Sequence, residues 1–410
     1  MTKRACRFCS ASLEHSFVDL GTMPLANAYL SAKDLDTPEP AYPLRAFVCT
    51  ECWLVQADGF VPPEDIFSNY AYFSSYSKSW VDHARRFTVM ARERFKLNAD
   101  SQVIEIASND GYLLRHFIDA GIPVLGIEPA QNIAEVARTA GIPTETCFFS
   151  KNTAETLVNR GFSADLVVGN NVFAHAPDIN DFVSSLALVL KPDGVISLEF
   201  PHLLQLIRNV QFDTVYHEHF YYLSLLAVEK VFTSHKLRIL DVEELSTHGG
   251  SLRVLACRQT SKKYAIGPGL AKVRADEIAA GLDKADIYEA FQGHVEPIRD
   301  GLLAFLHQAK SEGKSVVAYG AAAKGNTLLN FCGIESDLID YVVDINPHKQ
   351  EHFMPGSKLA IYAPEMMART RPDYVLILPW NIQKEVMASN DIQAWGGRFV
   401  VAVPELSVLE

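Results

Sequence analysis

Apolar and polar positions alternate through the middle of the chain in the order typical of strands and helices. Five short apolar runs predict strands, at 102–107, 124–127, 143–147, 165–169 and 195–200. Amphipathic stretches at 112–120 and 132–139 predict helices between the first of these strands. Because strands that alternate with helices form parallel sheets covered on both faces, this region predicts a doubly wound α/β sheet. Two later runs, 238–242 and 251–257, predict an antiparallel pair that closes the sheet.

A second alternating pattern begins in the C-terminal third of the chain. A long amphipathic stretch over 292–312 predicts a helix that leads into it. Four apolar runs then predict strands, at 315–319, 338–343, 374–378 and 399–403. Their spacing leaves room for helices, so a second, Rossmann-like α/β unit is predicted. We therefore expect three domains, at residues 1–65, at 66–260 with a helical lead-in over 66–98, and at 261–410.

Bulk composition narrows the class of protein. The 410 residues are 48% apolar and 21% charged, which is enough for proper cores and argues against general disorder. The net charge of −12 argues against nucleic-acid binding, which needs a concentrated basic patch. The first residues carry no secretory signal, and no apolar run approaches the roughly 18 residues of a membrane span. A cytoplasmic protein with reduced cysteines and no membrane partner is expected.

The first domain carries two Cys-x-x-Cys pairs, Cys6 with Cys9 and Cys49 with Cys52. Each pair lets two thiolates reach one ion, and two pairs complete the four-sulfur tetrahedral shell that zinc favours. A closed shell leaves no open position, so the predicted Zn²⁺ is structural. The alternatives are coincidental pairs of free cysteines or a redox pair.

The turn after the first strand of the central domain is the candidate cofactor site. It spans 105–111, where small residues let the backbone approach a ligand and Gly111 gives a tight turn into a helix. Glu128 ends the second strand, where a carboxylate can accept both hydroxyls of a ribose. A nicotinamide site needs a G-x-G-x-x-G turn for its pyrophosphate, which is missing here. S-adenosylmethionine (SAM) has no phosphate, so the pattern favours SAM over NAD.

Other strand ends predict further cofactor contacts. Asn170, Asn171 and His175 follow the fourth strand, where they would face the methionine part of SAM. Phe148 or Phe149, after the third strand, is predicted to lie on the adenine, and core packing is the alternative for both rings. The cofactor-binding candidates are Glu105, Ala107, Asn109, Gly111, Glu128, Pro129, Phe148, Asn170, Asn171 and His175.

The segment 212–220 places Tyr216, His217, Glu218 and His219 in four consecutive positions. Histidine has a pKa suited to a general base near neutral pH. The segment also follows the fifth strand on its carboxyl side, where α/β proteins bind ligands. Three alternatives stay open, namely metal ligation by the two histidines, ordinary surface histidines, and satisfied core residues.

The motifs of this chain occur in the order of a known family. Besides the cysteine pairs they are 20–27 (LGTMPLAN), 42–44 (YPL), 72–77 (YFSSYS), 105–111 (EIASNDG), 216–220 (YHEHF), 248–253 (HGGSLR), 319–327 (YGAAAKGNT) and 330–334 (NFCGI). In this order, over nearly the whole chain, the sequence resembles the sugar C-methyltransferases of deoxysugar biosynthesis. The resemblance implies a zinc-binding N-terminal domain, a SAM domain and a C-terminal α/β domain. It also implies a nucleotide-linked 4-keto-6-deoxysugar of the dTDP or GDP type as the substrate.

The resemblance assigns roles within the Tyr-x-Glu-His-Phe pattern of the family. It implies that His219 is the general base and that Tyr216 and Glu218 support it or the developing enolate oxygen. His217 falls at the variable position and is expected to be a bystander. A further family tyrosine precedes the SAM domain and is matched to Tyr72.

The turn 320–327 opens a helix after the first strand of the C-terminal unit. Small residues there permit close backbone approach, the helix N-terminus favours an anion, and Lys324 adds a positive charge. This predicts a site for the substrate diphosphate, and a helix packed tightly on its sheet is the alternative. The substrate-binding candidates are Tyr76, His248, Arg253, Tyr319, Gly320, Lys324, Asn326, Asp344, Trp380 and Asn381.

The expected reaction is methylation at C3 of the ketosugar. His219 removes a proton next to the C4 ketone, and the enolate carbon takes the SAM methyl group. Methylation at C5 stays an alternative, because ketone chemistry can activate both positions. The rivals are a nicotinamide-dependent oxidoreductase of nucleotide sugars and a non-enzymatic zinc-stabilised scaffold. A monomer and a small homo-oligomer are both compatible with the sequence.

Overall fold

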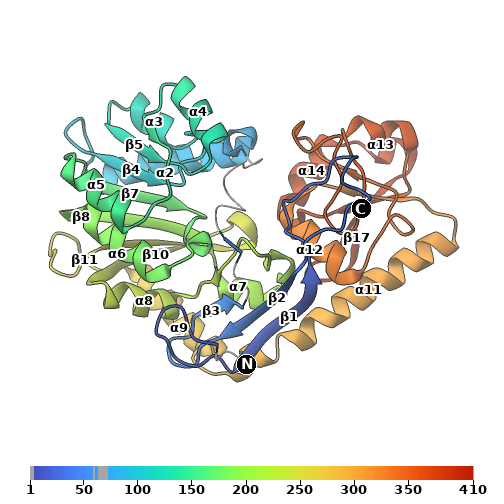
Figure 1. Cartoon of the computed structure of the whole chain (residues 1–410), viewed down its shortest axis with the longest axis horizontal. Helices are drawn as coiled ribbons and strands as arrows, with labels where there is room; N and C mark the ends of the chain where they lie inside the picture. Colours follow the sequence, from blue (N-terminus) through green and yellow to red (C-terminus); the bar gives the residue numbers. More distant parts are fainter. Residues whose placement is uncertain (1–3, 59–60, 63–72, 410) are drawn as a thin grey trace.

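The structure is a computed structural model, which describes residues 4–58, 61–62 and 73–409. Within these residues the strands form a four-stranded N-terminal sheet, a seven-stranded central sheet and a six-stranded C-terminal sheet. Figure 1 shows the central and C-terminal units on opposite sides of the molecule, with the N-terminal strands β1 (His15–Met23) and β2 (Tyr42–Val48) below and between them. The α/β architecture predicted from the alternating pattern is confirmed.

The central sheet has the strand order β10-β11-β8-β7-β4-β5-β6. Its members are β4 (Val103–Ile106), β5 (Val124–Ile127), β6 (Thr144–Glu145), β7 (Ala164–Asn170), β8 (Leu190–Pro201), β10 (Leu237–Leu245) and β11 (Ser251–Arg258). The strands from β4 to β8 pair in parallel, whereas β11 pairs antiparallel with both β8 and β10. The predicted closing pair is therefore present.

Neighbouring residues of the central strands point to opposite faces, and helices cover both faces. Val103 and Leu166 join a core with α2 (Lys78–Phe95) and α3 (Leu114–Asp119). Ile104 and Val167 join the core on the other face, which α5 (Lys151–Asn159), α6 (Ile179–Val189) and α8 (Leu225–Ser234) complete. This period of two is expected for strands buried on both sides. The remaining helices of this unit are α4 (Gln131–Thr139), α7 (Leu203–Arg208) and α9 (Pro268–Ala280).

The N-terminal sheet has the order β1-β2-β3-β9. Its third strand is β3 (Val55–Ala57), and its last strand, β9 (Tyr221–Tyr222), comes from the segment just after the Tyr-His-Glu-His cluster. The N-terminal unit thus extends beyond the segment 1–65. Helix α9 in turn packs on β10 through Leu270, although it lies past residue 260.

The C-terminal sheet has the order β14-β13-β12-β15-β16-β17. Its members are β12 (Val316–Tyr319), β13 (Val342–Val343), β14 (Ile361–Tyr362), β15 (Tyr374–Ile377), β16 (Arg398–Val401) and β17 (Ser407–Leu409). The helices of this region are α10 (Asp286–Glu289), α11 (Gln292–Ser311), α12 (Ala323–Cys332), α13 (Glu365–Thr370) and α14 (Gln383–Ser389). The strand predicted over 338–343 is shorter than expected, because only Val342 and Val343 pair with β12 and β14.

The short 3-10 turns complete the described chain. They are η1 (Ser74–Tyr76), η2 (Phe173–His175), η3 (Phe212–Thr214), η4 (Thr247–Gly249), η5 (Trp380–Ile382) and η6 (Gln393–Trp395). Within the described part of the chain, no helix combines the length and the apolar character needed to cross a bilayer.

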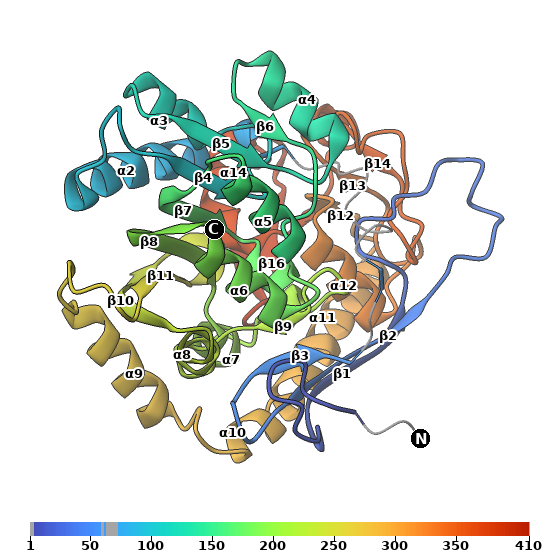
Figure 2. The same cartoon turned by 60° about the vertical axis from the view of Figure 1, so that its left-hand side comes forward.

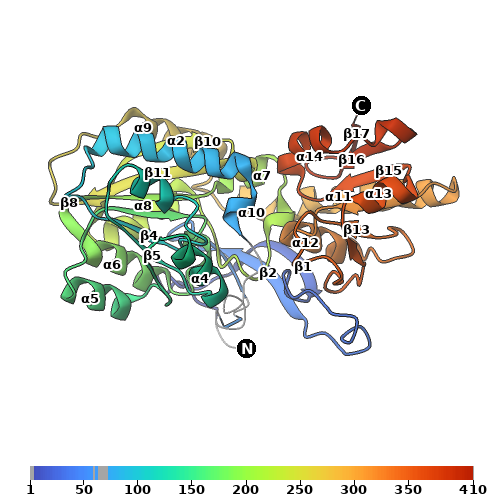
Figure 3. The same cartoon turned by 90° about the horizontal axis from the view of Figure 1, so that it is seen from above.

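The N-terminal strands connect the two larger units. Phe17 of β1 stacks on Phe291, just before α11, with ring centroids 4.4 Å apart. The connection between β1 and β2, prominent in Figure 2, reaches the C-terminal unit, where the Leu30 N–H donates to the Phe353 carbonyl. Seen from above in Figure 3, the central and C-terminal units lie side by side with β1 and β2 running between them. The junction of all three units is therefore where residues from distant parts of the sequence meet.

Candidate active site

A cavity of about 590 Å³ lies at the carboxyl ends of β4, β5 and β7. Its wall includes Asn27 from the N-terminal unit, Glu128 and His219 from the central unit, and Lys324 from the C-terminal unit. Fourteen of the residues singled out from the sequence line it, namely Ala107, Asn109, Glu128, Pro129, Phe148, Phe149, Asn170, Asn171, His175, Tyr216, Glu218, His219, His248 and Lys324. The carboxyl edge of a parallel sheet is where α/β proteins bind ligands.

The turn after β4 approaches the cavity with unusual backbone angles. Ala107 has φ of 54°, Asn109 has φ of 51° and Gly111 has φ of 78°. A side chain at Gly111 would overlap the Cδ1 of the buried Ile142, so both the backbone angle and the space require glycine there. Ala107 and Asn109 line the cavity, whereas Gly111 shapes the turn from behind.

Glu128 stands at the end of β5 with its carboxylate held by backbone donors. Its Oε2 accepts from the Asn109 N–H at 2.9 Å and its Oε1 accepts from the Ala130 N–H at 2.9 Å. Burial raises the pKa of Glu128 to about 7, although these two hydrogen bonds oppose the rise. Each oxygen keeps a second lone pair, so the group fits the two hydroxyls of a ribose.

Glu105 lies beneath the turn and does not line the cavity. It is 1% exposed, and its Oε2 has no hydrogen-bond partner among the described residues. Burial, followed by the charges of Asp110 and Glu128, raises the pKa of Glu105 well above its usual value. A neutral carboxyl under the turn is what these surroundings favour. Glu105 therefore supports the turn from beneath. The prediction that it contacts the cofactor is not met, because its side chain does not reach the cavity.

The end of β7 and the turn after it supply further polar groups to the cavity wall. Asn170 donates from Nδ2 to the Tyr112 hydroxyl at 3.2 Å, and Asn171 donates from Nδ2 to the His248 Nε2 at 2.8 Å. His175 donates from Nδ1 to the Glu218 carbonyl at 2.7 Å. That bond connects the end of β7 with the segment that carries the candidate base.

The His219 side chain is buried and lines the cavity. Its Nδ1 lies 2.8 Å from the Thr214 carbonyl oxygen. A carbonyl only accepts, so Nδ1 carries the proton and the neutral ring has its lone pair on Nε2. Burial, followed by the neighbouring His175, lowers the pKa of His219 well below its usual value. The ring is therefore neutral at physiological pH.

Glu218 and Tyr216 flank this imidazole. Asn27 donates from Nδ2 to the Glu218 Oε1 at 3.1 Å, while the Glu218 Oε2 is buried without a partner in the described residues. Burial raises the pKa of Glu218 to about 7. The Tyr216 ring lies 4.0 Å from the His219 ring, centroid to centroid, at an interplanar angle of 32°. A carboxyl group with a raised pKa and an aromatic ring thus border the candidate base.

His217 points away from this group. Its Nε2 donates to the Tyr42 carbonyl at 3.2 Å, and its ring meets the Tyr42 ring edge-on with centroids 6.0 Å apart. His217 is absent from the cavity wall. The two histidines therefore do not share a metal, and the position of His217 fits that of a bystander.

Lys324 brings a positive charge to the cavity from the start of α12. Its Nζ donates to the Asn381 Oδ1 at 2.7 Å and lies 4.5 Å from the centre of the Trp380 ring. Trp380 donates from Nε1 to the Asp213 Oδ2 at 2.7 Å, which links the C-terminal unit to η3. Burial lowers the pKa of Lys324, and Asp213 partly opposes that change. Asn381 and Trp380 therefore orient the lysine and do not themselves line the cavity.

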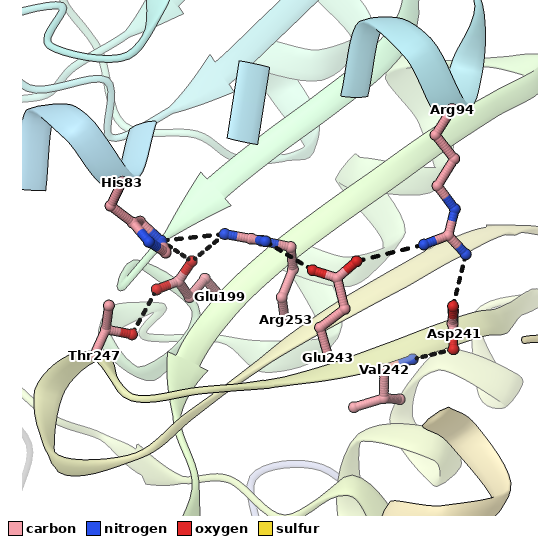
Figure 4. Close-up of polar contacts among 8 residues, drawn as sticks. All are labelled: His83, Arg94, Glu199, Asp241, Val242, Glu243, Thr247 and Arg253. Carbon is pink, nitrogen blue, oxygen red and sulfur yellow. Dashed lines mark hydrogen bonds and ion pairs between the residues drawn. The ribbon is translucent and has the colours of Figure 1, made fainter. Parts of the chain in front are cut away.

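Two other substrate candidates, Arg253 and Asp344, form contacts within the fold and do not face the cavity. Arg253 is buried among carboxylates and His83 (Figure 4), and its guanidinium makes ion pairs with Glu199 and Glu243. Asp344 accepts from the backbone N–H groups of Ala321 and Asn346, so its carboxylate braces the turn before α12. These two predicted substrate contacts do not lie in the cavity wall, because the fold itself satisfies their charges.

The remaining predicted residues lie around the cavity without lining it. Tyr319 and Gly320 form the end of β12 and its turn, and Gly320 has φ of 90°. Asn326 is 1% exposed, with both side-chain polar atoms unpartnered in the described structure. Tyr76 is 52% exposed and stacks on Phe73. The predicted Tyr72 lies outside the described residues.

The four cysteines of the two Cys-x-x-Cys pairs form one cluster. Their sulfurs all lie within 4.8 Å of one another, with Cys6 and Cys52 3.6 Å apart and Cys9 and Cys49 3.5 Å apart. Sulfurs around a tetrahedral zinc are about 3.8 Å apart, given Zn–S bonds of about 2.3 Å. The donor set and its spacing thus fit a structural Zn²⁺. Among the described residues this is the one such group of three or more potential metal ligands.

Three family models match consecutive parts of the chain. The model described as "Putative zinc binding domain" matches residues 6–67, "Methyltransferase domain" matches 81–242, and "C-methyltransferase C-terminal domain" matches 246–404. Their order agrees with the order expected from the motifs.

A curated relative covers almost the whole chain. The "C-methyltransferase NovU" of Streptomyces niveus is 35% identical over 405 residues, which make up 98% of this chain and 96% of that protein. This chain belongs to the C-methyltransferase family. The "Ubiquinone biosynthesis O-methyltransferase" of Bartonella bacilliformis is 28% identical over 99 residues, 24% of this C-methyltransferase and 40% of that protein.

Solved methyltransferase structures align with part of the C-methyltransferase. Magnesium protoporphyrin IX methyltransferase of Synechocystis, solved with bound SAM, covers 43% of the chain and 77% of its own length, at 17% identity and a TM-score of 0.33. A SAM-dependent methyltransferase of Mesorhizobium loti covers 43% of the chain and all of its own length, at 14% identity and a TM-score of 0.34. The family models and the curated relative establish SAM as the cofactor of this C-methyltransferase.

Several cavity residues of the C-methyltransferase carry no signal in the sequence that marks them as binding residues. They are Asn27, Trp80, Tyr112, Thr214 and Lys349, among others. Asn27 lies in the 20–27 motif, to which the sequence assigns no role. Trp80 and Tyr112 sit on helical or turn positions whose apolar neighbours suggest core packing, so no local signal distinguishes them. Lys349 follows β13 in sequence and reaches the cavity only through the folding of the C-terminal unit.

Proposed function

We propose that this C-methyltransferase methylates a nucleotide-linked 4-keto-6-deoxysugar of the dTDP or GDP type at C3, with His219 as the base. The observation that carries the proposal is the cavity itself, which gathers Glu128, His219 and Lys324. These groups offer a ribose acceptor, a neutral base and a cation for a diphosphate. The order of the motifs and the full-length similarity to a C-methyltransferase also support it.

His219 would remove the proton at C3 through Nε2, since Nδ1 is bonded to Thr214. Its low pKa keeps the lone pair free, although it also makes the free imidazole a weak base. Proton transfer leaves an imidazolium beside an enolate. Opposite charges attract strongly in a buried site, and this attraction offsets the weak basicity as the charges develop.

Glu218 would stabilise the enolate oxygen. A carboxyl whose pKa is raised to about 7 is protonated in a large share of molecules at neutral pH, and a protonated carboxyl donates a hydrogen bond. Such a donor gains most when negative charge builds on the acceptor oxygen. Tyr216, packed on the His219 ring, would hold the imidazole in plane with the substrate carbon.

The cofactor would lie along the ends of β4, β5 and β7. When bound, SAM supplies a methyl group on a positively charged sulfur, which is the electrophile for the substrate carbanion. Glu128 would accept the ribose hydroxyls, and Asn109 and Asn170 would border the same part of the cavity. Phe148, which lines this region, is placed to cover the adenine.

The diphosphate of the substrate would lie near Lys324 and Lys349, which both line the cavity on the C-terminal side. Lys349 donates from Nζ to the Ala321 carbonyl at 2.7 Å and is thereby held next to the turn before α12. Two cations at a helix N-terminus provide the charge that a diphosphate needs.

Proton exchange tests the base separately from methyl transfer. The protein is incubated with a nucleotide 4-keto-6-deoxysugar and S-adenosylhomocysteine in D₂O, and deuterium at C3 is followed by NMR. His219→Asn should lose exchange and methylation by at least about 10²-fold while S-adenosylhomocysteine still binds by isothermal titration. His217→Asn is the matched control and should stay within about twofold of wild type.

Several results would overturn the proposal. Exchange at the wild-type rate in His219→Asn would remove the assigned base. Deuterium at C5 in place of C3 would move the methylated position. Binding of NAD without binding of S-adenosylhomocysteine would favour the oxidoreductase rival.

A further inference from the structure

A chain of hydrogen-bonded polar side chains links α2, β8, β10, β11 and η4 (Figure 4). Glu199 of β8 is fully buried, and its Oε2 accepts from the Arg253 Nη2 at 3.0 Å and from the His83 Nε2 at 2.8 Å. Its Oε1 accepts from the Thr247 hydroxyl at 2.9 Å. Three elements, α2, β11 and η4, thus meet on one carboxylate.

The chain continues away from the cavity. Arg253 also donates from Nη1 to the Glu243 Oε2 at 2.8 Å, and Arg94 pairs with both Glu243 and Asp241 (Figure 4). Burial raises the pKa of Glu199, but the hydrogen bond from His83 and the charge of Arg253 outweigh it and hold that pKa below its usual value. Glu199 is therefore an ionised inner end, and Glu243, Arg94 and Asp241 form the outer part of the same chain.

The inner end supports two rings of the cavity wall. Thr247 directly precedes His248, whose left-handed φ of 51° is unusual for a histidine. The His248 ring meets the Trp80 ring edge-on with centroids 5.1 Å apart, and the His83 ring stacks on Trp80 with centroids 4.9 Å apart. Glu199 thus accepts hydrogen bonds from Thr247, the residue before His248, and from His83, which stacks on Trp80.

The same turn touches the C-terminal unit. A side chain at Gly249 would overlap the Trp380 ring, so the turn packs directly against η5. Because the His248 Nε2 accepts from Asn171, its Nδ1 carries the proton of the neutral ring. The wall therefore offers a neutral N–H donor where the central and C-terminal units meet.

We propose that Glu199 and Thr247 are positioning residues that hold His248 so that it donates a hydrogen bond to an oxygen of the sugar nucleotide. This inference rests on the proposed function for the identity of the substrate. A hydrogen bond that is made equally in the ground state and in the transition state contributes uniform binding, so its loss raises KM and leaves kcat nearly unchanged. The SAM side of the cavity, around Glu128, is built by other residues and should be unaffected.

Removal of one hydroxyl tests the proposal. Thr247→Val keeps the shape of the side chain and loses its bond to Glu199, so the KM for the ketosugar should rise about tenfold. The kcat and the affinity for S-adenosylhomocysteine should stay within about twofold. Thr247→Ser restores the hydroxyl and should restore KM. Hydrogen–deuterium exchange of residues 246–250 should speed up in Thr247→Val and return to wild type in Thr247→Ser.

Glu243→Gln is the matched control, because it alters the outer part of the same chain, away from Thr247 and His248, and should leave KM within about twofold of wild type. A Thr247→Val protein with unchanged KM and unchanged exchange would overturn the proposal. So would an equal rise of KM in Glu243→Gln. If the wild type methylates no ketosugar, the proposed function fails. The positioning role is tested separately, because unchanged hydrogen–deuterium exchange of residues 246–250 in Thr247→Val would refute it by itself.

Discussion

Replacement of Gly111 by alanine should loosen the cofactor turn by an amount that can be worked out in two parts. The backbone there has φ of 78°, and this region costs a residue with a Cβ about 1–2 kcal/mol. The new Cβ would also overlap the Cδ1 of Ile142 and lie 3.1 Å from its Cγ1, which adds an overpacking cost of about 1–3 kcal/mol. Gly111→Ala should therefore lower the free energy of unfolding of the central unit by about 2–5 kcal/mol.

Two companion variants separate the parts. Gly121 has φ of 72° with nothing near its would-be Cβ, so Gly121→Ala should show the backbone cost alone. Ile142→Val removes the Cδ1 that Gly111→Ala would meet, and by itself it should cost about 0.5–1.5 kcal/mol. In the double variant the overlap with Cδ1 is gone and only the 3.1 Å contact with Cγ1 remains, so most of the overpacking cost should be relieved, giving a favourable coupling of about 1–3 kcal/mol.

Urea unfolding followed by far-UV circular dichroism, together with titration of S-adenosylhomocysteine, measures these effects. Equal losses in Gly111→Ala and Gly121→Ala would refute the steric reasoning. Strict additivity of Gly111→Ala and Ile142→Val would do the same.

Two other outcomes follow from the cavity and the cysteine cluster. Glu128 has a pKa raised to about 7 in the free protein, and its ionised form is the better acceptor for ribose hydroxyls, so affinity for S-adenosylhomocysteine should fall as the pH drops below 7. Between pH 8 and pH 6 the loss should be about tenfold by isothermal titration, and a flat profile in wild type would contradict it. Elemental analysis should find about one zinc per chain, lost in Cys49→Ala and kept in the control Cys257→Ala, and a zinc-free folded wild type would contradict the site.

Much of the site could be predicted because the signals are local. The alternation of strands and helices places Glu128 and Asn170 at strand ends, and parallel strands bring those ends to one edge. The cysteine spacing likewise predicts a four-sulfur cluster. These inferences need only the order of elements along the chain.

Other inferences failed because a sequence does not show which polar groups the fold already satisfies. Arg253 and Asp344 have the charge and the strand position of binding residues, yet each is bonded to carboxylates or backbone N–H groups. Their partners come from distant segments, so only the tertiary arrangement reveals them. Trp80 shows the opposite case, since a helix residue with an apolar side chain turned out to line the cavity.

The position of strand β9 in the N-terminal sheet affects the design of chimeras in which domains of such enzymes are exchanged. Its two residues complete the N-terminal sheet by pairing with β3, and the Ala57 N–H also donates to the carbonyl of Phe220, the residue after His219. A chimera cut between the cysteine domain and the methyltransferase domain would therefore pair a foreign β3 with the native active-site segment. An exchange that keeps this pairing intact should move residues 216–222 together with the N-terminal sheet. The segment that has to be exchanged is therefore discontinuous in sequence.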